Sequence, residues 1–497
     1  MKLSSGLVAL AALVGAGVNA QAVCPSVALR REVRSLSPAD WAMTVDVLTR
    51  MNANGWTQWF SSLHQQNFML IHGNEIFFPF HRRLLADFES VARRFNPRFA
   101  IPYWDVTRDY ANMAASAVLS SRYIGGNGVA PNNCVVNGFP FNANLTYPNR
   151  HCLQRQFNNN GQIYTMYSPE HVLSVLQKAT NMATFRPKIE LSLHGSLHIS
   201  LSGDMIQKWS PNDFAFWMHH ANLDRVWFVW QMRNPAQNFW AADGKDSQGK
   251  PIGLSTRLPA YNTLIGDTMY PGRNGMCFTY DDYVSPATKR RSLEPRNRKC
   301  RHRDGGSGGI LGPLKGLVDG VLADVNDIVG NSEQAVVGAI ATGMPAHLHD
   351  KWFPNINNTA TYTANDIPPN PLPPVAGPAA APDTDTSGLQ APPAVPPCAS
   401  EMDKPNDTLA TDEPYVMFDA GVAGPKYPMA NPYPFTKHLI KMHGYSEAEV
   451  KAAYAESLEF TRDMNAAKYQ SPFAGGVASL ISNLGNTVGN VLDSAGL

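Results

Sequence analysis

The sequence predicts a mainly helical fold, because apolar residues recur at helical spacing in three separate segments. Within residues 81–88, three apolar side chains follow a histidine at positions i+3, i+4 and i+7. A longer apolar stripe, rich in tryptophan and phenylalanine, runs along residues 214–230. Residues 445–464 are also helical in pattern, and Ser446 is a candidate N-cap followed by acidic residues in the first turn. Each segment would bury one face of a helix.

Two groups of three histidines lie in or beside these segments and indicate a pair of metal sites. Imidazole is a suitable ligand for copper, zinc, iron and nickel, and a site with three protein ligands leaves a position open for chemistry. The six residues are His64, His72 and His81 in the first quarter of the chain, and His194, His198 and His220 in the middle.

The first group is expected to span two helices and the turn between them. Gly73 and Pro79 favour a loop or short turn around His72. His81 opens the helix that follows, on its buried face. His64 would then come from the helix that precedes the turn.

The second group is expected on two further helices. Glu190, His194 and His198 are four residues apart, so they would project from one helical face. His220 lies inside the apolar stripe of residues 214–230 and therefore faces the core. A single histidine is usually a hydrogen-bonded core or surface residue. Six buried imidazoles without partners would each cost ~1–3 kcal/mol, and a metal pair satisfies all of them together.

The motifs that carry these histidines resemble the two copper motifs of the tyrosinase and catechol oxidase family. The first motif is HGNEIFFPFHR, and the second is LHGSLH followed by SPNDFAFWMHHANLDRVW. IPYWD at residues 101–105 resembles the segment that follows the first motif, and the histidine spacing of eight then nine residues is closest to short secreted fungal members. The resemblance covers residues 24–285 and, more weakly, a helix near the C-terminus.

This resemblance implies a four-helix bundle with a binuclear, type 3 copper centre that uses O2 as co-substrate. The ligands implied are His64, His72 and His81 for the first copper, and His194, His198 and His220 for the second. Copper also suits the chemistry, because oxidation of a phenol by O2 needs a redox metal and zinc has no accessible redox couple.

The resemblance also assigns roles to residues beside the ligands. Glu190 would orient a water that helps to deprotonate a phenol, and Phe216 would gate the site. Gly195 stands where many strong phenol hydroxylases of the family carry asparagine, and Ile199 would add an apolar wall. The implied activity is oxidation of o-diphenols to o-quinones, with phenol hydroxylation weak or limited to small phenols.

Three more positions complete the predicted surroundings of the ligands. His219 would lie behind the ligands, in contact with them but not with the metal, or would form part of the pocket wall, since it points about 100° away from His220 on a helix. Asp224 would either fix an imidazole or form a salt bridge or cap. The cysteine that forms a thioether in some relatives is replaced by Leu70.

Other functions remain open at this point. An o-aminophenol or a hydroxyindole of a pigment or secondary-metabolite pathway would offer the same two ortho donors as a catechol. An O2 carrier would use the same metals, although a further domain normally covers its site. A dinuclear zinc or iron hydrolase would need bridging carboxylates, and Glu190 is the one carboxylate close to the histidines in sequence.

Composition favours a folded, exported protein with a small phenolic or catecholic partner. With 44% hydrophobic and 16% charged residues and a net charge of +1, the chain can bury a core and gives no reason to expect nucleic acid. Residues 1–20 are typical of a secretory signal. Three sequons are candidate glycan sites, at Asn144, Asn357 and Asn406. No stretch after the signal is apolar and long enough to span a bilayer.

The six cysteines would then allow up to three disulfides in fifteen possible pairings. They are Cys24, Cys134, Cys152, Cys277, Cys300 and Cys398.

The predicted organisation places the catalytic core at residues 21–285, after the signal. Residues 286–400 are basic and then rich in proline and glycine, so we expect an insertion or linker without a compact core. Residues 401–470 should contain a helical segment that packs on the core, and residues 471–497 a tail. The run Lys289, Arg290, Arg291 is either a maturation cleavage site, with the following segment shielding the pocket of a latent precursor, or an exposed basic loop.

Overall fold

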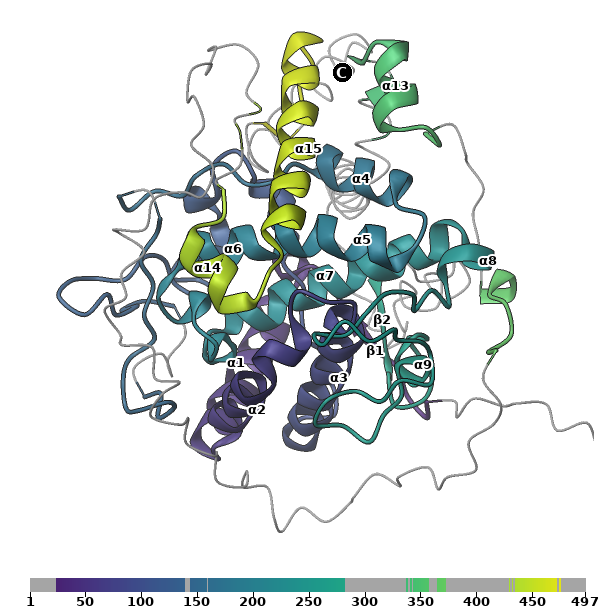
Figure 1. Cartoon of the computed structure of the whole chain (residues 1–497). Coiled ribbons are helices and arrows are strands. Elements are labelled where there is room, and N and C mark those ends of the chain that lie inside the picture. The colour runs from purple at the N-terminus through teal and green to yellow at the C-terminus, as the bar shows by residue number, and fades with distance from the viewer. Residues whose placement is uncertain are drawn as a thin grey trace, which may run out of the picture.

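The fold is mainly helical, as predicted (Figure 1). The computed structural model describes residues 24–138, 144–158, 160–281, 343–356, 364–371 and 434–471, with single positions at 337, 340, 341, 429, 431, 473 and 474. Several predictions lie outside these residues: the signal, Cys300, Cys398, Asn357, Asn406, the basic run 289–291, and most of 286–400 and of the tail. Asn144 is described, and its side chain is exposed.

The first motif lies on two consecutive helices. Helix α1 (Pro38–Ala53) begins after Ser37, whose hydroxyl accepts the N–H of Asp40. Gly55, at φ 82°, lets the chain reverse into α2 (Trp56–Ile71), and α3 (Phe77–Phe95) follows. Helix α1 packs against both α2 and α3.

The second motif lies on a broken helix and on a long buried one. Helices α4 (Pro169–Lys178) and α5 (Met182–Ile189) lead into a π-helical turn (Glu190–His194), which continues as α6 (Gly195–Leu201). Helix α7 (Phe214–Arg233) packs against α3 through the stacked rings of Phe88 and Trp217, 3.7 Å apart. The four segments that carry the histidines therefore meet along the α3–α7 contact.

The remaining regular elements are short. Strands β1 (Ala28–Arg30) and β2 (Phe278–Tyr280) form a two-stranded parallel sheet in which Ala28 pairs with Phe278. The disulfide Cys24–Cys277, which joins the residue directly before β2 to the segment that leads into β1, ties the two ends of the core together. The other short helices are α8 (Pro235–Asn238), α9 (Ile265–Thr268) and α13 (Ala346–Trp352).

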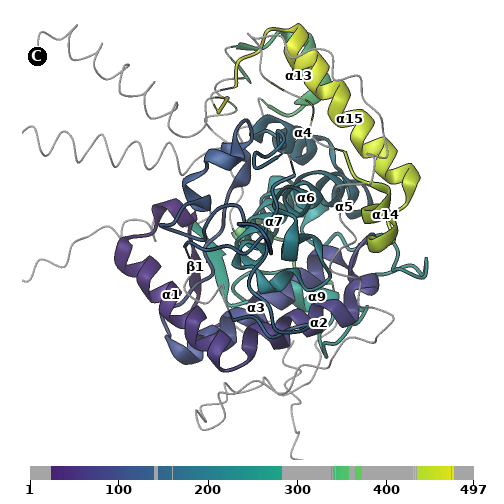
Figure 2. The same ribbon diagram turned by 90° about the vertical axis from the view of Figure 1, so that its left-hand side faces the viewer.

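Two C-terminal helices return to the core, α14 (Lys437–His443) and α15 (Glu447–Ala466). Ser446 caps α15 as predicted, because its hydroxyl accepts the N–H of Glu449. Both views show α15 running beside α4 and α5, with α14 next to it (Figures 1 and 2). Within the described residues, no helix is both long and apolar enough to cross a membrane.

Buried polar contacts fasten α15 to the core. His171 of α4 hydrogen-bonds Ser457, and Tyr469, beyond the end of α15, donates to Glu170. At the rim, Glu456 pairs with both Lys178 and Lys188. The C-terminal segment is therefore docked along its length.

Candidate metal centre

The structure brings the first three histidines together. His64 lies in α2, His72 directly follows that helix, and His81 lies in the second turn of α3, as the sequence predicts. All three side chains are buried, and their closest ring nitrogens lie within 4.8 Å of one another. Among the described residues, no carboxylate or thiolate joins this group.

The second three histidines form an equivalent group. His194 closes the π-helical turn, His198 lies in α6 and His220 in α7, again within 4.8 Å of one another and buried. The regular α-helical ladder predicted from Glu190 to His198 is wrong in one detail, because its first five residues form a π turn. Such turns are rare and occur frequently at functional sites.

The two groups lie side by side. His81 and His220, one from each group, stack with ring centroids 4.3 Å apart, and His72 and His194 stack at 5.8 Å. Two metal ions held by these groups would therefore be neighbours in one buried centre.

Backbone carbonyls orient five of the six imidazoles. In each, Nδ1 faces a main-chain oxygen, so that Nε2 is the nitrogen available to bind a metal ion. The pairs are His64 with Lys208, His72 with Phe68, His81 with Phe77, His194 with Glu190, and His198 with Met205.

The buried imidazoles fit a metal pair. Nε2 of five of them is buried with no hydrogen-bond partner among the described residues: His64, His81, His194, His198 and His220. Burial lowers the pKa of all six, to about 3 for His64 and about 4 for His198, so the rings are neutral and able to bind metal. Neutral imidazoles without carboxylate or thiolate suit two copper ions.

Glu190 lies beside both groups in a charged network. Its Oε1 accepts the N–H of Gly73, at 2.8 Å, and its Oε2 pairs with Arg186, at 3.2 Å. Arg186 also binds Glu75 in the core and Glu449 of α15. Burial raises the pKa of Glu190 to about 7, although the charge of Arg186 and the Gly73 N–H act in the opposite direction.

The other predicted residues also lie at the centre or directly behind it. Phe216 is fully buried, and its ring lies 4.2 Å from that of His220 and 5.1 Å from that of His64, so it contacts both groups. His219 lies behind the ligand groups, and its Nε2 donates to the carbonyl of His194.

Asp224 binds no imidazole within the part of the chain that the structure describes. It accepts hydrogen bonds from Arg82, Tyr280 and Arg30. Of the roles predicted for it, the salt bridge is the correct one, and it ties α7 to α3 and to both strands.

Sequence reasoning raised a shielding segment after residue 291 but identified none of the side chains that cover this centre. We call residues 434–445 the cover. The ring of His443 lies 5.4 Å from that of His72, and it stacks on Tyr445 at 4.8 Å. Phe435 lies on Gly195, where an added Cβ would be 2.0 Å from its ring. The cover shares an apolar cluster with Ile199 and other core residues: Phe68, Leu191 and Ile206.

With the cover seated, none of the six histidines is more than 5% exposed. A helical protein with two adjacent three-histidine groups belongs, by its site, among binuclear metalloproteins. Comparison with known proteins identifies which kind.

A family model described as the common central domain of tyrosinase matches residues 47–233. Tyrosinase-like protein phomQ2 of Diaporthe leptostromiformis is 31% identical over 294 residues, which cover 52% of this chain and 74% of that protein. The tyrosinase of Streptomyces glaucescens is 30% identical over 210 residues, or 38% of this chain and 74% of its own.

Among solved structures, a polyphenol oxidase from Thermothelomyces thermophila aligns with a TM-score of 0.44 at 21% identity, covering 51% of this chain and 88% of that chain. The chain belongs to the tyrosinase family. It is a copper oxidoreductase that acts on phenolic substrates.

Proposed function

We propose that the chain is a secreted oxidase that converts o-diphenols to o-quinones with O2 and hydroxylates phenols weakly. The observation that carries this proposal is the pair of adjacent, buried three-imidazole groups, in which five of the six Nε2 atoms have no hydrogen-bond partner among the described residues. The proposed ligands are His64, His72 and His81 for the first copper, and His194, His198 and His220 for the second.

In this reaction the diphenol loses two electrons and two protons, and two such oxidations reduce one O2 to two waters. Two bound copper ions supply the redox couple between the diphenol and O2. The chain supplies a dry, apolar wall, in which Phe216 and Ile199 exclude water around the substrate ring. Glu190, which is hydrogen-bonded to Arg186 and to the N–H of Gly73, would orient a water that accepts the phenol proton.

The proposed weakness of hydroxylation rests on Gly195. This residue carries no side chain beside Glu190, so no amide helps to hold the water. The phenoxide that hydroxylation requires should therefore form more slowly than in an enzyme with asparagine there. An o-diphenol has a second hydroxyl and is more easily oxidised, so it depends less on this assistance.

The test is an assay of copper-loaded protein on a monophenol and an o-diphenol that differ by one hydroxyl. We expect quinone from the diphenol at least tenfold faster. The variant His220→Ala should lose one copper per chain and the activity, while Asp46→Asn, an exposed change, should lose neither. Equal rates on both substrates would contradict the diphenol preference, and full activity with one copper per chain would contradict the paired centre.

Export is supported by the signal-like residues 1–20 and by two disulfides, Cys24–Cys277 and Cys134–Cys152, because disulfides persist in oxidising compartments. We propose the same division of the chain as above: core 21–285, linker 286–400, C-terminal helical segment 401–470 and tail 471–497. N-terminal sequencing of protein from the medium of an expressing culture should begin near Gln21. Retention of the whole product inside the cells would contradict export.

We also propose that the intact chain is latent and that cleavage near Lys289, Arg290 and Arg291 activates it. The support is the cover: it belongs to the segment after this basic run, and it seals the histidine groups. Mass spectrometry of the secreted protein should find a cut form that is more active than the intact chain. A single intact chain with full activity would contradict latency.

A further inference from the structure

One loop orients an imidazole from each histidine group. The loop joins α6 to α7 and contains two 3-10 turns, Gly203–Ile206 and Ser210–Asn212. Nδ1 of His198 donates to the carbonyl of Met205, and Nδ1 of His64 donates to the carbonyl of Lys208 at 2.7 Å.

This arrangement differs from that of three other histidines. Nδ1 of each of these faces the carbonyl four residues earlier in its own segment; they are His72, His81 and His194. A helix fixes those carbonyls, whereas the positions of the Met205 and Lys208 carbonyls depend on what holds the loop.

Asp204 holds the loop together from within. Its carboxylate is buried, at 2% exposed. Oδ1 accepts from His151 Nε2, at 2.9 Å, and from Trp209 Nε1, at 3.0 Å, with Asn212 Nδ2 at 3.3 Å. Two of these donors lie on the loop itself, on the far side of Lys208. The carboxylate therefore closes the loop around both ligand-orienting carbonyls.

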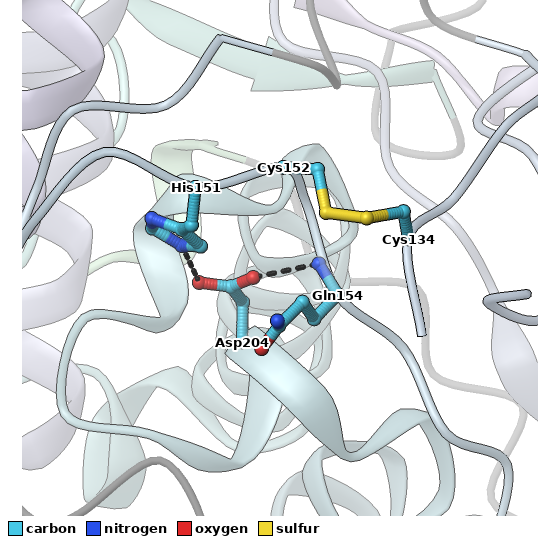
Figure 3. The surroundings of a disulfide bond; sticks show 5 residues. All are labelled: Cys134, His151, Cys152, Gln154 and Asp204. Carbon is cyan, nitrogen blue, oxygen red and sulfur yellow. Dashed lines mark hydrogen bonds and ion pairs between the residues drawn. A yellow bond between two sulfur atoms is a disulfide. The ribbon is translucent and has the colours of Figure 1, made fainter. Parts of the chain in front are cut away.

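The same carboxylate fastens the loop to a neighbouring segment. Oδ2 accepts the N–H of Gln154 at 2.8 Å (Figure 3). In addition, the backbone N–H of Asp204 donates to the carbonyl of Gln154 at 3.0 Å. Gly203, at φ +55°, permits this approach, because a Cβ there would lie 2.2 Å from the Gln154 carbonyl. Figure 3 shows the disulfide Cys134–Cys152 directly beside His151 and Gln154.

We propose that Asp204 is a positioning residue for the copper centre, acting on His64 and His198 at once through the carbonyls of Lys208 and Met205. This inference rests on the proposed ligand roles of those two histidines. Because one histidine belongs to each group, Asp204 couples the geometry of the first copper site to that of the second.

The test is copper binding to the folded apo protein, titrated in competition with a chelator, with copper per chain measured by elemental analysis. Both carboxylate oxygens of Asp204 accept from N–H groups. In Asp204→Asn, an NH2 group replaces one of these oxygens and cannot accept those hydrogen bonds. Loss of a group that orients metal ligands typically weakens binding by about 10–100-fold. We expect a loss of about tenfold at both copper sites.

The matched control is Asp109→Asn. Asp109 is also a buried carboxylate that accepts from a tryptophan indole, that of Trp104, and from a neighbouring hydroxyl, that of Ser116, and it also pairs with Arg34. It orients no histidine, so this variant should lose thermal stability but keep its copper affinity. Equal copper affinities for the two variants would overturn the proposal, as would a loss confined to one copper site.

A milder variant keeps the test decisive if Asp204→Asn does not fold. His151→Ala removes one donor to Asp204 from the partly exposed side, and it should weaken copper binding about threefold. Unchanged binding in this variant would also overturn the proposal. If the unaltered chain binds fewer than two coppers, the proposed copper centre itself is wrong. If every variant binds two coppers equally well, the centre is correct and only the role of Asp204 is wrong.

Discussion

Gly195→Ala should release the cover and activate the intact chain. Gly195 lies at φ −63° and ψ −32°, so its backbone accepts alanine without strain, and alanine favours a helix by about 1 kcal/mol over glycine. The new Cβ, however, would lie 2.0 Å from Cζ and 2.6 Å from Cε1 of Phe435. No methyl group fits at that distance, so the Phe435 ring must leave its place.

The magnitude follows from the burial of that ring. Phe435 is 4% exposed and packs against Tyr445 and Ile199 in the apolar cluster of the cover. Returning a buried phenylalanine to water costs about 1.5–3 kcal/mol. The equilibrium between seated and displaced cover should therefore shift toward displacement by about 10–100-fold, and the diphenol oxidation of uncut protein should rise by up to that factor.

The assay compares Gly195→Ala with Gly195→Asn on the intact, copper-loaded chain. Both variants displace Phe435, so both should oxidise the o-diphenol faster. Asparagine alone adds an amide beside Glu190, so it alone should raise the ratio of phenol hydroxylation to diphenol oxidation. Phe435→Ala alone forfeits the same burial, so it should loosen the cover to a similar extent, and adding Gly195→Ala to it should change the oxidation rate little further. If Gly195→Ala binds two coppers and leaves both the oxidation rate and protease cleavage of the cover unchanged, this reasoning is refuted.

Three further predictions concern stability. Asp224→Asn leaves Arg82 buried without its carboxylate, whereas Arg30 keeps its pairing with Glu89. Urea unfolding should therefore show a loss of about 3–5 kcal/mol, against under ~0.5 kcal/mol for the exposed control Asp46→Asn, and equal losses would contradict the role of this network. Burial lowers the pKa of His151, but the hydrogen bond and the charge of Asp204 outweigh this effect and raise the pKa above its ordinary value of ~6.5. The pair therefore contributes its full stabilisation below pH ~6.5, and this contribution is lost as the pH rises through the folded-state pKa. The difference in melting temperature between the unaltered chain and His151→Ala should therefore be larger at pH 5.5 than at pH 9, and the opposite trend would contradict this assignment. Copper at a free concentration 100 times its Kd should stabilise the apo protein by about 2.7 kcal/mol for each site that it fills, and addition of a chelator should reverse the gain in melting temperature. A melting temperature that does not depend on copper would count against the metal centre.

The helices and the histidine groups could be predicted because their signals are local. Three apolar stripes with helical spacing fix α3, α7 and α15, and the six histidines lie on or beside such segments. The π turn at Glu190–His194 could not be predicted in this way. A π turn differs from an α-helical turn in its backbone hydrogen bonds, which run from i to i+5. The four-residue spacing of Glu190, His194 and His198 is the same in the sequence for either conformation.

Contacts between segments that lie far apart in the sequence could not be predicted either. Asp224 was predicted either to orient an imidazole or to form an ion pair, and the sequence could not decide, because its partners Arg30, Arg82 and Tyr280 come from three distant segments. His443 and Phe435 lie more than 200 residues beyond His220, in a region without a copper motif. Their place over the centre depends on how α15 docks, which no periodicity reveals.

The cover also gives a physical reason for the glycine after His194. At this position a side chain would meet Phe435 while the cover is seated, so a chain that keeps Phe435 in place must keep Gly195. The same glycine leaves Glu190 without a neighbouring amide. Close shielding of the metal centre and weak phenol hydroxylation are therefore two consequences of one missing side chain, and a substitution that improves hydroxylation at this position should also loosen the shield.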